Sequence, residues 1–221
     1  MIEAVLFDLD GLLINSEPFW QEAEYSMFQN LGIEITPKIK EITYGLPVKE
    51  MIEFYYKIKP WDNFNLNKIK YKIFDEVEKK IIDQGNMLPG VLEIIEYFKK
   101  KKLKTGIASA SPYGIIYAAL DKLKIRDKFD IIHSGDEEEY GKPHPAVYIN
   151  AAKKLNIKPI NCLVFEDSLV GVIAALSARM KVVAIVRNDN GNNAKYAVAD
   201  LQLNSLADFT KKHFELLNTF H

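Results

Sequence analysis

Short, unbroken runs of apolar residues alternate with longer stretches of helical periodicity along most of the 221-residue chain. The runs do not alternate between polar and apolar positions, which is typical of strands buried on both faces of a parallel sheet. Five strands are therefore predicted, at Ile2–Phe7, Lys104–Ala108, Phe129–His133, Asn161–Phe165 and Val182–Val186.

Helical periodicity fills the segments between these strands and follows the last one. Helices are predicted at Val91–Lys101, Pro112–Leu123, Pro145–Leu155, Val170–Ala178 and Leu206–Leu217. Ser111 can cap the second of these helices, because proline at position 112 suits the first helical position. The regular succession of strand and helix predicts a doubly wound α/β domain with a parallel sheet.

One region interrupts this succession, because no strand is predicted between about residues 15 and 84. Helical periodicity runs through Phe19–Leu31, Val48–Tyr56 and Ile69–Ile82. We interpret this block as a small α-helical cap domain, residues 15–85, inserted into a core domain of residues 1–14 and 86–221. Its hinges are expected at residues 12–15 and 85–88.

Charge and cysteine content narrow the class of protein. The 29 Lys and Arg residues and 30 Asp and Glu residues give a net charge of −1, which predicts no binding to nucleic acid or to an anionic membrane. The single cysteine, Cys162, lies in an apolar run and is interpreted as a small buried residue of a cytoplasmic protein. The apolar N-terminal run is too short for a signal peptide or a membrane span. We expect a monomer.

The first predicted strand ends in Asp8-Leu9-Asp10-Gly11. Ligands of doubly wound sheets bind at the carboxyl ends of the strands, and carboxylates two residues apart on an extended segment point to the same side. One carboxylate can therefore act as a nucleophile and the other as an acid/base. Gly11 lets the backbone approach a ligand closely. A chance Asp-x-Asp in a surface turn is the alternative.

Three further segments place polar residues at the same edge of the predicted sheet, where its strands end. Ser109 ends the second strand, and its hydroxyl with nearby amides can hold a phosphoryl oxygen; alternatively it caps a helix. Lys142 lies in Gly-Lys-Pro-His-Pro before a predicted helix and is directed at the same edge; a solvated lysine is the alternative. Glu166 and Asp167 end the fourth strand and offer oxygen ligands to Mg²⁺, unless Asp167 or Ser168 only caps the next helix.

Together, Asp8-x-Asp10-Gly11, Ser109, Lys142 and Glu166-Asp167 resemble the four motifs of the haloacid dehalogenase superfamily, and the resemblance covers nearly the whole chain. It implies a Rossmann-like core and a phosphatase that forms an aspartyl-phosphate on Asp8. Asp10 would then act as the acid/base, and Lys142 and Ser109 would hold the transferring phosphoryl group.

The same resemblance implies a Mg²⁺ ion held by Asp8, Asp167 and the carbonyl oxygen of Asp10. Glu166 is either a direct ligand or a partner of the ligands. Dehalogenases of the superfamily lack an acid at the position of Asp10, so its presence favours a phosphate ester with an alcohol leaving group.

The region after the first motif resembles the sugar-phosphatase branch near beta-phosphoglucomutase. Ser-Glu-Pro-x-Trp at 16–20, Ala-Ser-Pro at 110–112 and Lys-Pro-His-Pro at 142–145 are similar to bacterial 2-deoxyglucose-6-phosphate and hexitol-phosphate phosphatases. We therefore expect sugar or polyol phosphates as substrates. Candidate substrate-binding residues are Gly11, Glu17, Trp20, Gly45, Lys49, Ala110 and Ser111.

A phosphosugar mutase is the alternative function. The mutase of this branch carries a cap histidine at the position of Trp20 and a cap arginine near Lys49; tryptophan cannot titrate, and lysine lacks the bidentate fork of arginine. A binding protein without activity is disfavoured because every charged motif residue is present. Trp20 can also simply pack in the cap, Glu17 can be a first-turn helix acid, and Lys49 can be solvated. The acidic run 136–139 is interpreted as a solvated loop.

Overall fold

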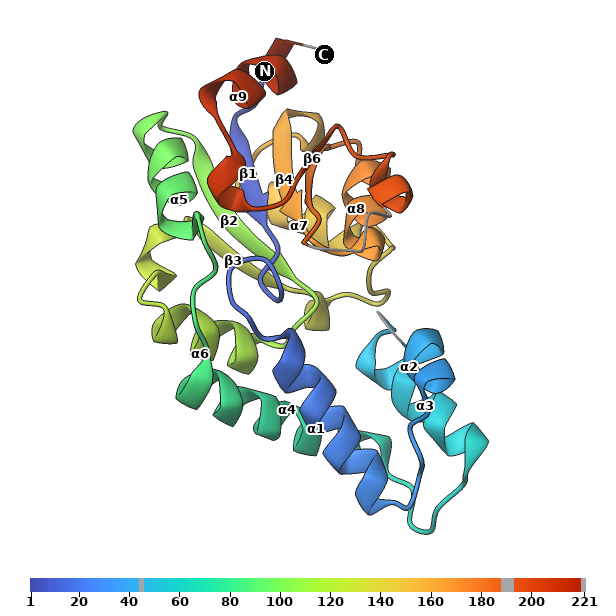
Figure 1. Cartoon of the computed structure of the whole chain (residues 1–221). Coiled ribbons are helices and arrows are strands. Elements are labelled where there is room, and N and C mark those ends of the chain that lie inside the picture. The colour runs from blue at the N-terminus through green and yellow to red at the C-terminus, as the bar shows by residue number, and fades with distance from the viewer. Residues whose placement is uncertain (44–45, 188–192, 220–221) are drawn as a thin grey trace.

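The computed structural model describes residues 1–43, 46–187 and 193–219. Within these residues the strands form a six-stranded parallel sheet in the order β3-β2-β1-β4-β5-β6 (Figure 1). The strands are β1 (Ala4–Phe7), β2 (Lys104–Ser109), β3 (Ile131–Ser134), β4 (Cys162–Glu166), β5 (Lys181–Ile185) and β6 (Leu201–Leu203).

The strand order reverses between β1 and β4. The chain first adds β2 and β3 on one side of β1, then crosses over and adds β4, β5 and β6 on the other side. Phe7 of β1 pairs with Ile107 of β2 and with Phe165 of β4, so the residues after β1 and β4 lie side by side. Such a point of reversal is where ligands bind in doubly wound sheets.

Apolar side chains cover both faces of the sheet. Val5 and Phe7 of β1 belong to a cluster with α5 (Val91–Lys100), α6 (Tyr113–Lys122) and α9 (Lys211–Thr219), whereas Ala4 and Leu6 belong to a cluster with α7 (Ala146–Lys154) and α8 (Leu169–Ser177). Every residue of β1 is therefore buried. This two-sided burial is the physical reason why the strand runs are continuously apolar.

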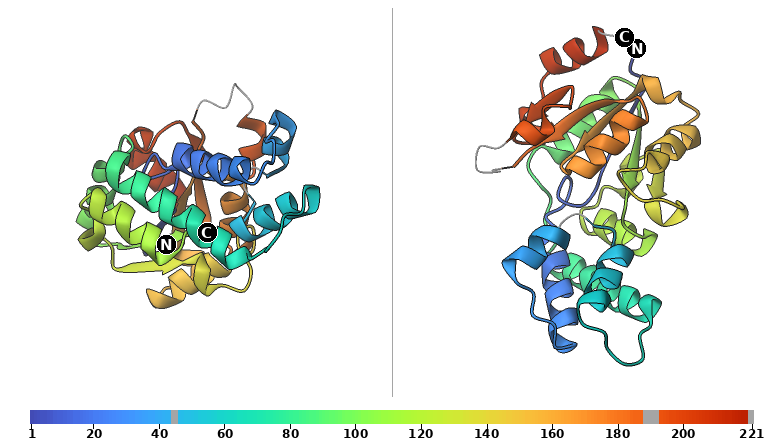
Figure 2. Two further views of the ribbon diagram at one scale, coloured as in Figure 1. Left: turned by 90° about the horizontal axis from the view of Figure 1, so that it is seen from below. Right: turned by 90° about the vertical axis from the view of Figure 1, so that its right-hand side faces the viewer.

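Four helices lie beyond the carboxyl ends of the strands (Figures 1 and 2). They are α1 (Glu17–Asn30), α2 (Pro37–Thr43), α3 (Val48–Ile58) and α4 (Leu66–Gln84), and we call them the helical body. One apolar stripe of α4, buried at Ile69, Ile73, Val77 and Ile81, follows helical spacing and packs against α1. α4 also packs against α6 beside the sheet.

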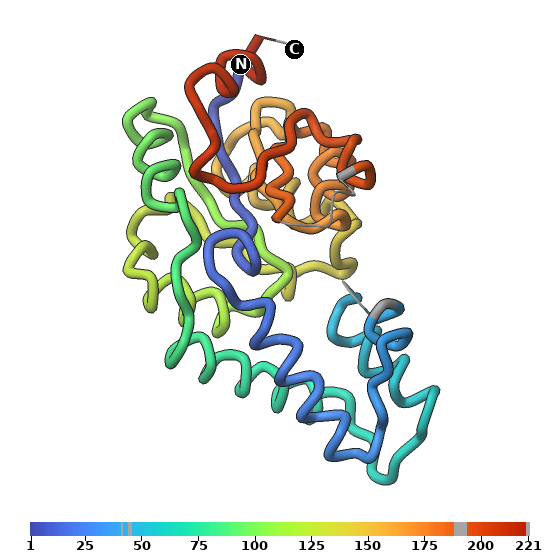
Figure 3. Tube along the Cα trace, in the orientation of Figure 1, coloured from blue at the N-terminus to red at the C-terminus, as the bar shows by residue number. Residues whose placement is uncertain are grey.

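Two adjacent segments join the helical body to the sheet. Ile14 pairs with Met87, the amide of Leu88 donates to Leu13 O at 3.0 Å, and the amide of Asn15 donates to Asn86 O at 3.1 Å. These contacts lie at the segments where the hinges were predicted. The N-terminus and α9 lie at the opposite end of the molecule (Figures 1 and 3), where the amide of Ile2 donates to Asn218 Oδ1 at 2.7 Å.

The structure corrects four details of the predicted elements. β6 and α2 were not predicted, and the predicted helix 206–217 is a 3-10 turn at Leu206–Asp208 followed by α9. Pro112 is the N-cap of α6, which begins at Tyr113, so Ser111 does not cap this helix.

No helix among the described residues is both long and apolar enough to cross a membrane.

Candidate active site

Asp8 follows the last residue of β1 and lies at the point where the strand order reverses. Its amide donates to Phe165 O of β4 at 3.1 Å, which continues the sheet pairing past the strand end. Gly11 then turns the chain with φ of 71°, and a Cβ at this position would lie 2.1 Å from Asp167 Oδ2. Only glycine fits a left-handed turn this close to another carboxylate.

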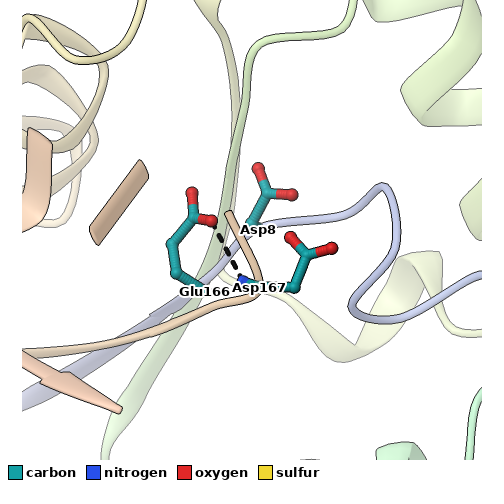
Figure 4. Close-up of side chains that lie close together, drawn as sticks. All are labelled: Asp8, Glu166 and Asp167. Atoms are coloured by element: carbon teal, nitrogen blue, oxygen red, sulfur yellow. Dashed lines mark hydrogen bonds between the residues drawn. The ribbon is translucent and has the colours of Figure 1, made fainter. Parts of the chain in front are cut away.

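Asp8, Glu166 and Asp167 form an acidic cluster in which one oxygen of each carboxylate lies within 4.8 Å of the others (Figure 4). Burial, together with the negative charges of Glu166 and Asp10, outweighs the opposing charge of Lys142 and raises the pKa of Asp8 to about 7. Burial and the charges of Glu166 and Asp8 also raise the pKa of Asp167 well above its ordinary value. Crowded, buried carboxylates of this kind are suited to holding a cation.

Lys142 is buried between two members of this cluster. Its ammonium donates to Asp8 Oδ1 at 2.6 Å, to Glu166 Oε1 and to the hydroxyl of Tyr148 at 3.0 Å. Burial alone would lower the pKa of Lys142, but the carboxylates of Asp8 and Glu166 hold it above its ordinary value. Lys142 therefore carries a positive charge directly beside Asp8.

Both oxygens of Glu166 are already engaged by the protein. Oε1 accepts from Lys142 and from Tyr148 at 2.6 Å, and Oε2 accepts from the amides of Asp167 and Ser168, both at 3.1 Å, and from the Ser168 hydroxyl at 3.0 Å. A Cβ on Gly171 would lie 1.8 Å from Oε1, so α8 passes very close to this carboxylate. These contacts favour Glu166 as a residue that orients Lys142 and Asp167.

Asp10 is held by hydroxyl and indole donors from two segments, the start of α1 and the loop before α6. Ser16 Oγ and Trp20 Nε1 donate to Oδ1 at 2.6 Å and 2.9 Å, and Ser111 Oγ donates to Oδ2 at 2.6 Å. Ser111 thus binds Asp10, where the sequence had indicated a helix cap. Ser168, by contrast, does cap α8 through the amide of Gly171 at 3.1 Å, as one alternative had proposed.

A cavity of about 470 Å³ connects these groups with the helical body. The predicted site residues that line it are Asp8, Asp10, Gly11, Glu17, Trp20, Lys49, Ser109, Ala110, Ser111, Lys142 and Asp167. Glu166 is fully buried behind this lining, and Gly45 lies outside the described residues. Ser109 is buried and its hydroxyl accepts from the amide of Ser111 at 3.1 Å, so this turn has a fixed shape.

The sequence did not point to several residues of the cavity. Glu24, Lys70 and Phe74 line it from the helical body, and Tyr148 contacts Lys142 from α7. Glu24 lies one helical turn after Trp20 on the same face of α1, and this spacing was the available signal. Lys70 and Phe74 lie on α4, whose orientation depends on packing that the sequence pattern does not specify.

The acidic run 136–139 is not simply a solvated loop. Asp136 forms an ion pair with Lys70 of α4 at 2.9 Å. Glu138 is largely buried, contacts His133 Nε2 at 2.6 Å and accepts from the side-chain amide of Asn150 at 2.9 Å. The prediction of a solvated loop was therefore wrong for Glu138, because the loop folds back onto β3 and α7.

Comparisons with known proteins agree with this geometry. Hexitol phosphatase B of Escherichia coli is 34% identical over 96% of both chains, and a phosphorylated carbohydrates phosphatase of Thermotoga maritima is 30% identical over 87% of this chain and 89% of the relative. The crystal structure of beta-phosphoglucomutase from Clostridium difficile superimposes with a TM-score of 0.85, at 29% identity over 99% of this chain and 98% of that one. The model of the haloacid dehalogenase-like hydrolases matches residues 5–185, and the chain belongs to this family.

Proposed function

We propose that the protein is a Mg²⁺-dependent phosphatase that hydrolyses small sugar or polyol monophosphates through an aspartyl-phosphate on Asp8. The observation that carries this proposal is the convergence of Asp8, Asp10 and Lys142 at one end of a cavity. The similarity to phosphatases of hexitols and phosphorylated carbohydrates supports the substrate class. The helical body is proposed to form the cap domain, residues 15–85, that covers this site.

In the first step, a carboxylate oxygen of Asp8 attacks phosphorus and the bond to the ester oxygen breaks. Lys142, held 2.6 Å from Asp8, is placed to neutralise negative charge on the transferring phosphoryl oxygens. Asp10 donates its proton to the departing alkoxide, which leaves as an alcohol. Ser109, with the backbone amide of Ala110, is proposed to hold the remaining phosphoryl oxygens, while the amide of Ser111 holds the Ser109 hydroxyl.

In the second step, Asp10 accepts a proton from water, whose oxygen attacks phosphorus and releases inorganic phosphate. The Asp8 carboxylate is regenerated, and Asp10 is again protonated for the next cycle. Both roles require Asp10 to be positioned at the phosphoryl group, and its contacts with Ser16, Trp20 and Ser111 are proposed to hold it there.

The acidic cluster fits a hard divalent cation, since carboxylate oxygens are the ligands that Mg²⁺ prefers. We propose Asp8, Asp167 and the main-chain carbonyl of Asp10 as its ligands, with Glu166 orienting Asp167 through its amide. When bound, the ion would reduce the repulsion between the Asp8 carboxylate and the phosphate dianion. The protein is further proposed to work as a monomer in the cytoplasm, in keeping with one buried cysteine.

The mutase is the second candidate, because a solved structure named beta-phosphoglucomutase superimposes closely. A mutase must bind the second phosphate of a bisphosphate. The described lining of the cavity has no arginine, Lys70 is already paired with Asp136, and Lys49 lacks the bidentate fork with which arginine holds a phosphate. Trp20, at the position of the mutase's cap histidine, offers only a donor N–H. These features favour hydrolysis.

The experiment is a phosphate-release assay with Mg²⁺ on hexose and hexitol monophosphates, alongside an assay for conversion of a sugar 1-phosphate to its 6-phosphate. We expect free phosphate without isomerisation, loss of activity with a chelator, and at least a thousandfold loss with Asp8→Asn. Activity that survives Asp8→Asn would contradict the mechanism. Isomerisation stimulated by a bisphosphate would identify a mutase instead.

A further inference from the structure

The cavity carries an excess of negative charge beyond the groups that act on phosphorus. Among the described residues, seven carboxylates and three lysines line it. Two of the lysines have carboxylate partners, because Lys142 contacts Asp8 and Lys70 contacts Asp136. The third lysine, Lys49 of α3, also lines the cavity, but the carboxylates outnumber the lysines by seven to three, so a ligand with a second anionic group in the part of the cavity away from Asp8 meets a net negative lining.

Glu24 lies in that distant part of the cavity. The residues of α1 that line the cavity are Glu17, Trp20, Gln21 and Glu24, which share one face of the helix. Trp20 donates to Asp10, and Glu24 follows one turn later, ~6 Å farther along the helix axis. A sugar or polyol whose phosphate lies at Asp8 would direct its far end toward Glu24.

The carboxylate of Glu24 is held in place from the protein side. The hydroxyl of Tyr55 on α3 donates to Glu24 Oε1 at 2.6 Å. Tyr55 is fully buried and stacks on Phe28 with 3.9 Å between ring centroids, so this donor has little freedom. Burial raises the pKa of Glu24, which indicates that the carboxylate is partly removed from water. A fixed and partly desolvated acceptor binds a hydroxyl well and rejects an anion.

We infer that Glu24 is a specificity-determining residue, which accepts a hydrogen bond from a distal hydroxyl of a neutral sugar or polyol monophosphate and excludes substrates with a second anionic group. This inference rests on the proposed function and deepens it. Glu24 makes the cavity select the uncharged end of the substrate, whereas Asp8, Asp10 and Lys142 act on the phosphate end.

The test compares two esters that differ at one end: a hexitol 6-phosphate, and the 6-phosphate of the corresponding aldonic acid, in which a carboxylate replaces the terminal hydroxymethyl group. For the wild type we expect kcat/KM for the hexitol ester to exceed that for the acid by roughly thirtyfold or more, since the carboxylate of the acid would lie beside that of Glu24. Glu24→Gln keeps the shape of the side chain and removes its charge. We expect it to reduce this ratio about tenfold, mostly through KM.

Glu22→Gln is the matched control, because Glu22 lies on the same helix, is 62% exposed and forms an ion pair with Lys80 outside the cavity. In Glu22→Gln the ratio of kcat/KM for the hexitol ester to kcat/KM for the acid should equal that of the wild type. A purely structural effect of Glu24→Gln would lower both kcat/KM values together, and an unchanged ratio would overturn the inference while leaving the phosphatase assignment intact. If the wild type released phosphate from neither ester, the proposed function would fail and the inference with it.

Discussion

The indole N–H of Trp20 donates to Oδ1 of Asp10 at 2.9 Å, so a side chain of the helical body directly contacts the proposed acid/base beside the sheet. Trp20 itself packs edge-to-face on Phe74 of α4, with 6.0 Å between ring centroids. The indole nitrogen can donate a hydrogen bond but cannot accept one, so the carboxylate oxygen of Asp10 is the acceptor. The position of α1 and the orientation of Asp10 are therefore linked.

Trp20→Phe should lower kcat between roughly tenfold and a hundredfold, because a hydrogen bond to a charged group contributes about 1.5–3 kcal/mol. The ring would still pack against Phe74, so the loss should come from the missing N–H. Steady-state kinetics on a hexitol monophosphate would measure it, with thermal unfolding to verify the fold.

Trp61→Phe is the control for that change. Trp61 is the second tryptophan of the chain and packs against Phe28 and Tyr56, away from Asp10. Its kcat should stay within about a factor of two of the wild type, since a substitution outside the site has little effect on the reacting groups. Equal losses in the two variants would mean that the Trp20 contact with Asp10 has no role in turnover.

The parallel sheet was predictable because two-sided burial leaves a continuous apolar run in each central strand. β6 escaped prediction because it contains only Leu201, Gln202 and Leu203, and all three residues are only partly buried. α2 spans seven residues, too few for the helical period to emerge from the sequence. The segment 206–217 has the pattern of one helix because its apolar spacing continues across Phe209, whose extended backbone separates the 3-10 turn from α9.

The residues of the candidate site likewise divide into those that the sequence pattern revealed and those that it did not. Asp8 and Asp167 were predictable because each follows a predicted strand, and parallel strands end at one edge of a sheet. Lys142 was predictable because it lies in the loop between a predicted strand and the next helix, at that same edge. Tyr148 and Glu24 were not predicted, because the face that a helix turns toward a cavity depends on its tertiary packing. Ser111 fitted the pattern of a helix cap, but the nearby carboxylate of Asp10 is the acceptor that its hydroxyl reaches.

Lys142→Met should strongly reduce turnover and also destabilise the protein. The change leaves Asp8 and Glu166 buried without their shared cation, and breaking a buried ion pair costs about 3–5 kcal/mol. We expect a kcat reduced by roughly a hundredfold to a thousandfold and a clear fall in the urea midpoint. Lys153→Met on the exposed side of α7 is the control and should change neither quantity appreciably.

Gly11→Ala should inactivate the protein, because the new Cβ would need a left-handed backbone conformation and the space now held by Asp167 Oδ2. The backbone strain alone costs about 1–2 kcal/mol. Gly114→Ala is the contrasting variant: its Cβ would meet only the tip of Glu78 at 3.3 Å, and alanine favours helix by about 1 kcal/mol. Thermal unfolding should therefore shift down for the first variant and remain equal or shift up for the second.

The metal-free protein should lose stability as the pH rises from about 4 to about 7. The pKa of Asp8 is raised from 3.8 in the unfolded chain to about 7 in the fold. In that interval the folded state binds more protons than the unfolded state, so the free energy of unfolding falls with increasing pH. The stabilising contribution of protonated Asp8 is complete below its unfolded pKa and lost as the pH passes its folded pKa.

Mg²⁺ should reverse this loss, because a cation in the acidic cluster favours the ionised form of Asp8 and binds only the folded state. Thermal unfolding with chelator and with millimolar Mg²⁺ across this pH range would measure the effect, and the Tm increase caused by Mg²⁺ should grow toward pH 7. Asp8→Asn removes the titrating group, so its metal-free Tm should depend less on pH, and Mg²⁺ should raise it less. A Tm increase from Mg²⁺ that is equal at all pH values, or equal in Asp8→Asn, would place the ion away from Asp8.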